Sequence, residues 1–235
     1  MVKYIYTHLG LGDHIVCNGL VRTLIDANNE YIMFVKSHNR QTVEFMYRDI
    51  KNLSFIEGED HFVIEFLQKN NINSEDVIVA GFYTHPHAQH FDESFYLQNN
   101  LPHNYRWDKF GVIRDIEREK ELFSKFEVKE NEYVFIHDDP SRSFNIGDEH
   151  IINKNLKVIR PVVGYTNNVF DYCYLMENSI ESHFIDSSFR LIFDSLKLRN
   201  TNLFYHLKMK DGNRRNGNDK FSDASPGCLN YNLIE

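Results

Sequence analysis

A glycine-containing turn near the N-terminus is the segment whose residue types best suit chemistry. Gly10 and Gly12 lie three residues and one residue before Asp13, after a short run rich in tyrosine and isoleucine at 3–7. Glycines let a backbone come close to a ligand, and the start of a helix offers unpaired N–H groups. An aspartate at a helix start can also be a plain cap, but a cap does not explain the two glycines beside it. We therefore interpret Asp13 as a functional carboxylate.

The same turn departs from the dinucleotide-binding fingerprint. That motif needs a third glycine at position 15, where the chain has Ile15, and an acidic residue at the end of the second strand. Val35 ends the second strand-like run, and Lys36 follows it. The sequence therefore disfavours NAD binding. It also contains neither a P-loop nor a GxSxG nucleophile elbow.

Polar residues at three places in the second half could bind an anion. Asp186, Ser187 and Ser188 stand between an apolar run and an amphipathic one. Two hydroxyls beside free N–H groups suit a phosphate, and the same residues suit an ordinary helix cap. Arg142 could place its planar guanidinium on a diphosphate, or belong to a surface turn. Arg160 ends the next strand-like run and could lean toward the same ligand or remain solvated.

A histidine-rich segment follows the fourth strand-like run. His85, His87 and His90 have spacing that can bind zinc or copper, but no cysteine or closing ligand accompanies them. Pro86 indicates an irregular loop, so we favour a polar loop that lines a ligand-binding cleft over a metal site. Cys17 falls on the apolar side of the first helical pattern, and we interpret it as a core residue.

The elements that must position these residues alternate along the chain. Short apolar or β-branched runs are separated by patterns with helical spacing, which predicts crossovers between parallel strands and an α/β fold. The uninterrupted apolar run at Val77–Ala80 predicts a strand buried on both faces. Strands are expected at 3–7, 31–35, 53–56, 77–80, 133–137, 156–160, 182–185 and 202–206, and helices at 13–27, 40–50, 60–69, 114–126, 169–178 and 187–196.

This alternation occurs twice, which predicts two α/β domains. The expected N-terminal domain covers 1–112 and the C-terminal domain 131–210, with a helical bridge at 113–130 between them. The final segment, 211–235, is rich in glycine, asparagine, aspartate and serine over most of its length, which predicts a loosely ordered tail.

Composition narrows the classes of function and compartment. The 235 residues include 26 Lys plus Arg and 34 Asp plus Glu, for a net charge of −8, which disfavours general nucleic-acid binding. No apolar run is long enough to span a bilayer, and the first residues do not resemble a signal peptide. The three cysteines form no metal-binding spacing. We therefore expect a protein of the reduced cytoplasm without a membrane span.

Taken together, these segments resemble glycosyltransferases of the two-Rossmann-domain type, called GT-B, and most of all the heptosyltransferase-like group. In that group the first strand ends in a GxGD loop, which the Gly-Leu-Gly-Asp run at 10–13 matches. The segment 185–191 resembles the family's strand, small-residue trio and helix in the second domain. Residues 137–142 are similar to the loop where a basic residue meets the donor's phosphates. The resemblance implies two Rossmann-like domains whose parallel sheets face a central cleft.

The resemblance also implies roles for individual residues. Asp13 would be the catalytic base, and His14 and His85 would lie on the acceptor side. The nucleotide and diphosphate of the donor would be bound by Gly10, Gly12, Arg142, Arg160, Asp186, Ser187 and Ser188.

The expected activity is transfer of a sugar from a nucleotide-diphosphate donor to the hydroxyl of a glycan or other acceptor. The family likeness implies inversion at the anomeric carbon, no metal and no cofactor. Two alternatives stay open: a non-catalytic nucleotide- or sugar-binding module, and a nucleotide-sugar epimerase on the same scaffold.

Overall fold

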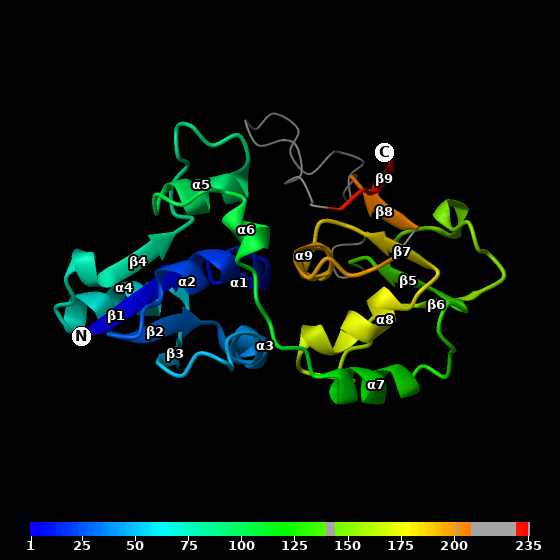
Figure 1. Cartoon of the computed structure of the whole chain (residues 1–235), viewed down its shortest axis with the longest axis horizontal. Coiled ribbons are helices and arrows are strands. Elements are labelled where there is room, and N and C mark those ends of the chain that lie inside the picture. Colours follow the sequence, from blue (N-terminus) through cyan, green and yellow to red (C-terminus); the bar gives the residue numbers. More distant parts are fainter. Residues whose placement is uncertain (140–143, 201, 208–228, 235) are drawn as a thin grey trace. The chain divides into compact units, whose positions relative to one another are not determined.

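The chain folds into two compact units, each built on its own sheet. The computed structural model describes residues 1–139, 144–200, 202–207 and 229–234. The first unit covers Met1–Ile113 and the second Arg114–Glu235. Figure 1 shows the first unit in blue to green and the second in green to red. The prediction of an α/β protein with two parallel sheets is confirmed.

The N-terminal sheet has the strand order β3-β2-β1-β4, and all its pairings are parallel. Its strands are β1 (Val2–Thr7), β2 (Glu30–Val35), β3 (Leu53–Glu57) and β4 (Val77–Ala80). Consecutive strands run in the same direction because a helical segment carries the chain back after each one. The carboxyl ends of β1 and β4 therefore lie at the same edge of the sheet.

The prediction that Val77–Ala80 is buried on both faces is wrong. Only Ala80 is buried, and Val79 is 38% exposed. β4 lies at the end of the strand order, so only β1 neighbours it within the sheet. An apolar run shows that a strand is hydrophobic, but the burial of its side chains depends on the strand's place in the sheet.

The helices of the first unit are mostly short. The expected helix at 13–27 is divided at Cys17 into α1 and α2, and two helices, α5 and α6, occur where none was expected. The α-helices are α1 (Leu11–Val16), α2 (Asn18–Leu24), α3 (Arg40–Met46), α4 (Asp60–Lys69), α5 (Phe91–Leu97) and α6 (Tyr105–Asp108), and the 3-10 turns are Ser37–Asn39 and Ser74–Asp76. Gly19 on α2 lets α6 approach, because a Cβ there would lie 2.1 Å from the carbonyl oxygen of Tyr105.

The C-terminal sheet has the strand order β6-β5-β7-β8-β9 and is also parallel throughout. Its strands are β5 (Tyr133–His137), β6 (Lys157–Ile159), β7 (Glu181–Phe184), β8 (Leu203–His206) and β9 (Asn232–Ile234). β9 corrects the prediction that all of 211–235 is loose, because its backbone pairs with β8, with Leu207 N donating to Ile234 O at 2.9 Å. Residues 211–228 lie outside the described residues.

Helices cover the C-terminal sheet through aromatic contacts. Phe189 of α9 packs against Phe135 of β5 and Tyr172, and Phe184 of β7 packs against Phe193. The α-helices are α7 (Ile116–Ser124), α8 (Cys173–Glu177) and α9 (Ser188–Ser195), with 3-10 turns at Asp148–His150 and Val169–Tyr172. Within the described ranges, no helix is long and apolar enough to cross a membrane.

Candidate functional site

The turn between β1 and α1 places Asp13 in the first helical turn after the strand. Gly10 is the N-cap residue, and His14 N donates to Gly10 O at 3.1 Å. A Cβ on Gly10 would lie only 2.6 Å from Asp13 Oδ2. Gly10 has an ordinary negative φ, so the close approach of the carboxylate explains this glycine better than backbone conformation does. Asp13 is half-buried and lies at the carboxyl end of a parallel strand, where ligands bind in such sheets.

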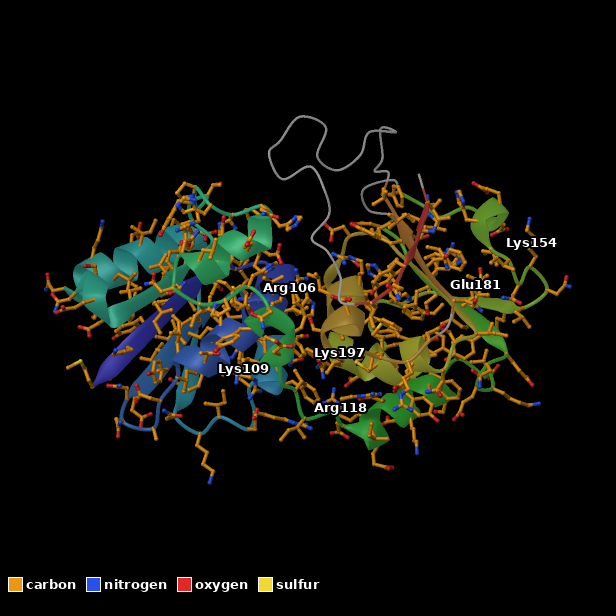
Figure 2. The ribbon with its side chains drawn as sticks, turned by 45° about the horizontal axis from the view of Figure 1, so that its top comes forward. Arg106, Lys109, Arg118, Lys154, Glu181 and Lys197 are labelled. Atoms are coloured by element: carbon orange, nitrogen blue, oxygen red, sulfur yellow. The ribbon has the colours of Figure 1, made fainter. Side chains whose placement is uncertain are left out.

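A buried ion pair from α5 and α6 lies close to Cys17, the residue that follows α1. Asp92 of α5 pairs with Arg106 of α6, and the His103 ring nitrogen Nε2 lies 2.8 Å from Asp92 Oδ2. Arg106 is fully buried, and Figure 2 labels it. The pKa of the Cys17 thiol is raised, chiefly by burial and further by the charges of Asp13 and Asp92. Cys17 is therefore a protonated core residue, as its position in the sequence predicted.

His14 is buried in the interior of the first unit. Its side chain is wholly buried on the inner side of α1, and burial lowers its pKa to about 4. Within the described part of the chain, neither of its ring nitrogens has a hydrogen-bond partner. The expected acceptor role for His14 is thus at odds with its burial, because α1 turns this residue toward the core.

His85 lies in the irregular loop that follows β4. It is half-buried, its backbone N donates to Ser94 Oγ at 3.0 Å, and His87 N donates to its Nδ1 at 3.3 Å. Across the described ranges, no three histidine, cysteine or acidic side chains are grouped so that they could hold a metal ion. The hydrogen bond from His87 N uses Nδ1 of His85, so the hydrogen bonds of this loop leave the other ring nitrogen, Nε2, unused.

Aromatic rings gather where β1 and β4 end. Phe82 packs on Tyr6 and His8, with ring centroids 4.3 and 4.9 Å apart, and Phe91 packs on His8 at 6.0 Å. Phe82 is 41% and Phe91 45% exposed. Gly81 permits the turn into this cluster, because its φ is +96°. Partly exposed rings at the end of β1 can pack against the apolar face of a sugar.

In the second unit, Arg160 is brought to the loop that follows β5. Its Nε lies 3.1 Å from Asp138 Oδ2, and its Nη2 donates to Ile146 O at 3.1 Å. Asp138 also accepts a hydrogen bond from Ile146 N. Arg160 therefore holds this loop while part of its side chain stays exposed. Arg142 lies outside the described residues.

Ser187 caps α9, as the residue types of this segment predicted. Its Oγ accepts from Arg190 N at 3.5 Å, and Ser188 is the first residue of the helix. Asp186 Oδ1 accepts from Arg190 Nη2 at 3.1 Å. The Arg190 guanidinium is buried over the Tyr205 ring, 4.6 Å from its centroid. Arg190 was missed, although its spacing of four from Asp186 is a signal for such a pair.

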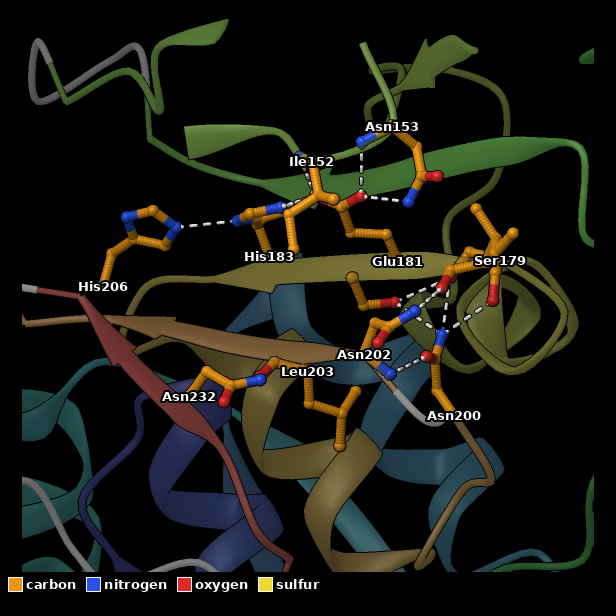
Figure 3. A network of polar contacts seen from close by, with 12 residues as sticks. Ile152, Asn153, Ser179, Glu181, His183, Asn200, Asn202, Leu203, His206 and Asn232 are labelled. Atoms are coloured by element: carbon orange, nitrogen blue, oxygen red, sulfur yellow. Dashed lines mark hydrogen bonds and ion pairs between the residues drawn. The ribbon is translucent and has the colours of Figure 1, made fainter. Parts of the chain in front are cut away.

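A buried chain of hydrogen bonds connects β7 and β8 (Figure 3). Glu181 Oε1 lies 2.7 Å from His183 Nε2, and His183 Nδ1 lies 2.9 Å from His206 Nε2. Glu181 also accepts from Ile152 N, Asn153 N and Asn153 Nδ2 at 2.8, 3.0 and 2.6 Å. The sequence analysis did not identify this chain, whose members are distributed over two strands and a loop.

The ionisation states of this chain follow from its surroundings. Burial would raise the pKa of Glu181, but hydrogen bonds from His183, Ile152 and Asn153 outweigh it and lower that pKa. Burial lowers the pKa of His183, and it lowers that of His206 to about 3, with nearby histidines adding to the effect. An ionised Glu181 accepts only, so His183 Nε2 donates to it, His183 Nδ1 accepts, and His206 Nε2 donates. His206 Nδ1 is thereby left as an acceptor.

Comparison with known proteins adds no relative. No protein-family model matches the sequence, and no curated protein or solved structure matches it either. The functional argument therefore depends on the residues and their geometry.

Proposed function

We propose that this protein is a glycosyltransferase that moves a sugar from a nucleotide-diphosphate donor to an acceptor hydroxyl. The proposal includes a GT-B-type arrangement, with the two sheets facing a common cleft. The observation that carries it is the packing of the Asp13 carboxylate against Gly10 at the carboxyl end of β1, which gives a physical reason for the GxGD sequence. The exposed rings of Phe82 and Phe91 beside His8 support an acceptor sugar on the same side.

In the proposed reaction, Asp13 acts as the general base. The acceptor oxygen attacks the anomeric carbon while its proton passes to the Asp13 carboxylate, and the bond to the diphosphate oxygen breaks. Attack from the face opposite the leaving group inverts the anomeric carbon. The nucleoside diphosphate leaves with the bonding electron pair, and the proton on Asp13 is later released to solvent.

The charge of the leaving diphosphate needs compensation in the second unit. The start of α9, with Ser187 and Ser188, offers N–H groups and the positive end of a helix dipole. Arg160 contributes a partly exposed cation, and Arg142 is proposed for the same role. Asp138 pairs with Arg160 and holds its guanidinium in place. Asp186 does the same for Arg190 in the first turns of α9. This arrangement supports a mechanism in which protein groups stabilise the leaving group.

The test compares Asp13→Asn with a matched control, Asp76→Asn. Asp76 is half-buried in a 3-10 turn of the same unit, away from the turn at Gly10. Donor sugars with each of the four common nucleotide bases are offered with a panel of sugar acceptors, and transfer is followed by mass spectrometry. Asp13→Asn should abolish transfer while binding of the nucleoside diphosphate, measured by thermal shift, stays near the wild-type value. Asp76→Asn should leave both unchanged.

Other outcomes identify the alternatives. Full transfer by Asp13→Asn refutes its role as base. Stabilisation by a nucleoside diphosphate with neither transfer nor hydrolysis supports a binding module. Formation of an epimerised nucleotide sugar without acceptor supports an epimerase.

A further inference from the structure

The second unit contains a cavity that shares no residue with the proposed transfer site. It lies between α7 and the loop that connects β6 to the 3-10 turn at Val169–Tyr172, and its volume is about 520 Å³. Figure 2 labels Arg118 on α7, one of its lining residues. Sites for small molecules commonly have volumes of roughly 300–1,000 Å³, so this cavity has room for a sugar ring or two.

The walls of the cavity are held in place by Asp171. This carboxylate is buried and accepts from Arg118 Nη2 at 2.8 Å and from Asn168 Nδ2 at 3.1 Å. Thr166 Oγ1 also donates to it. Arg118 belongs to α7 and the other residues to the loop and the turn after it, so Asp171 ties the two walls together. A site whose walls are already ordered loses less entropy when a ligand binds.

Tyr165 supplies an aromatic surface to the cavity. Its ring packs edge-on against Phe126, with centroids 5.4 Å apart, and it is still 39% exposed. Lys125 Nζ donates to Tyr165 O at 3.3 Å and lies 5.9 Å from the centre of the ring. Gly164 next to it has a φ of +86°, and a Cβ there would meet no atom within 4 Å. The ring is thus held by Phe126 and Lys125 and remains partly exposed.

The charges of the lining residues balance. Arg118 and Lys125 contribute two positive charges, and Glu121 and Asp171 contribute two negative ones. A nucleotide or other anion gains little from such a wall, because attraction and repulsion cancel. The wall does offer both donors and acceptors: the guanidinium of Arg118 and the ammonium of Lys125 donate, and the exposed Glu121 carboxylate accepts. A neutral ligand with many hydroxyl groups can use both kinds of partner.

We propose that this cavity binds a neutral carbohydrate, with the sugar ring packed on Tyr165 and its hydroxyl groups bonded to Glu121, Arg118 and Lys125. The C–H face of a pyranose suits the exposed aromatic face, and its hydroxyl groups suit the mixed polar rim. This inference rests on the cavity of the second unit and is independent of sugar transfer at Asp13. It assigns the second unit a carbohydrate-binding site of its own.

The test measures binding of neutral mono- and disaccharides by saturation-transfer NMR and titration calorimetry. Tyr165→Ala should weaken binding about tenfold or more, equivalent to about 1.4 kcal/mol, whereas Tyr165→Phe keeps the ring and should bind nearly as the wild type. Glu121→Gln should weaken binding severalfold. Glu117→Gln is the matched control, because Glu117 is exposed on the same helix but does not line the cavity. Thermal unfolding of each variant shows that it is folded.

Three results would overturn the proposal. The first is that no neutral sugar binds at millimolar concentration, and the second is that binding is unchanged in both Tyr165→Ala and Glu121→Gln. The third is that inorganic phosphate or a nucleoside diphosphate binds in the cavity and that Glu121→Gln strengthens this binding. Asp13→Asn should bind the sugar at Tyr165 as the wild type does, so a failure of the transfer proposal is distinguishable from a failure of this one.

Discussion

Replacement of Glu181 by glutamine tests the buried hydrogen-bond chain of the second unit. Oε1 accepts from Ile152 N and His183 Nε2, and Oε2 accepts from Asn153 N and Asn153 Nδ2. In Glu181→Gln, the amide oxygen can accept the two hydrogen bonds of one carboxylate oxygen, and the new NH₂ group then faces the two donors of the other oxygen. If the amide oxygen takes the position of Oε1, the NH₂ group faces Asn153. The Asn153 side chain can turn to present its oxygen to that group, but the backbone N–H of Asn153 is left without an acceptor.

The expected loss of stability follows from these contacts. A buried donor without a partner costs about 1–3 kcal/mol. The bonds that remain are also weaker, because hydrogen bonds to a charged group are roughly twice as strong as neutral ones. We therefore expect Glu181→Gln to lower the free energy of unfolding by about 3 kcal/mol, a large part of the roughly 5–15 kcal/mol of a typical domain.

Two measurements check this expectation. Urea unfolding followed by circular dichroism gives the loss of stability, and amide hydrogen exchange gives its location, because the amides of Ile152 and Asn153 should lose protection first. Glu149→Gln is the control, since Glu149 belongs to the same segment and its side chain is 73% exposed. Unchanged stability together with unchanged protection of Ile152 and Asn153 in Glu181→Gln would refute the reasoning.

Three further expectations follow from the geometry. Burial lowers the pKa of His206 from 6.5 to about 3, so the neutral form of His206 stabilises the fold above pH 6.5, and this stability is lost as the pH falls. The loss is up to about 1.4 kcal/mol for each pH unit below 6.5. It should shrink in His206→Gln when urea unfolding is repeated at several pH values. Gly10→Ala should slow sugar transfer about 100-fold with little change in unfolding, because the new Cβ must displace the Asp13 carboxylate, and an unchanged single-turnover rate would contradict this. Gly19→Ala should lower the stability of the first unit by about 2–3 kcal/mol, because its Cβ would collide with the Tyr105 carbonyl. The fluorescence of Trp107, the only tryptophan of the sequence, follows urea unfolding of this unit. An unshifted urea midpoint would show that α6 moves away from Gly19 at little cost.

Several elements were predictable because their signals are local. The bounds of α4 (Asp60–Lys69), β4 (Val77–Ala80) and β5 (Tyr133–His137) agree with those read from the sequence. The two strands are short apolar runs, and α4 has apolar residues at helical spacing, so each pattern lies within the element itself. Capping is local too: Ser187 is the N-cap of α9, as its residue type predicted.

Other elements were missed because their stability comes from distant partners. β9 has only three residues, and what identifies it is the backbone pairing with β8. α5 lies in a segment rich in histidine and polar residues, and its buried Asp92 is matched by Arg106, fourteen positions later. A window of neighbouring residues does not contain such partners, so a sequence pattern cannot reveal them.

The sequence alone determined the local features of the candidate site: the turn at Gly10, the carboxylate at Asp13 and the cap at Ser187. Tertiary structure alone decided which distant groups meet and which are buried. Glu181 and His183 reach His206 because β7 and β8 are neighbours in the sheet, and His14 is buried because α1 turns it inward. The physical reason is that hydrogen bonding and burial depend on strand order and on the packing of whole elements, whereas turns and caps depend on residues adjacent in the chain.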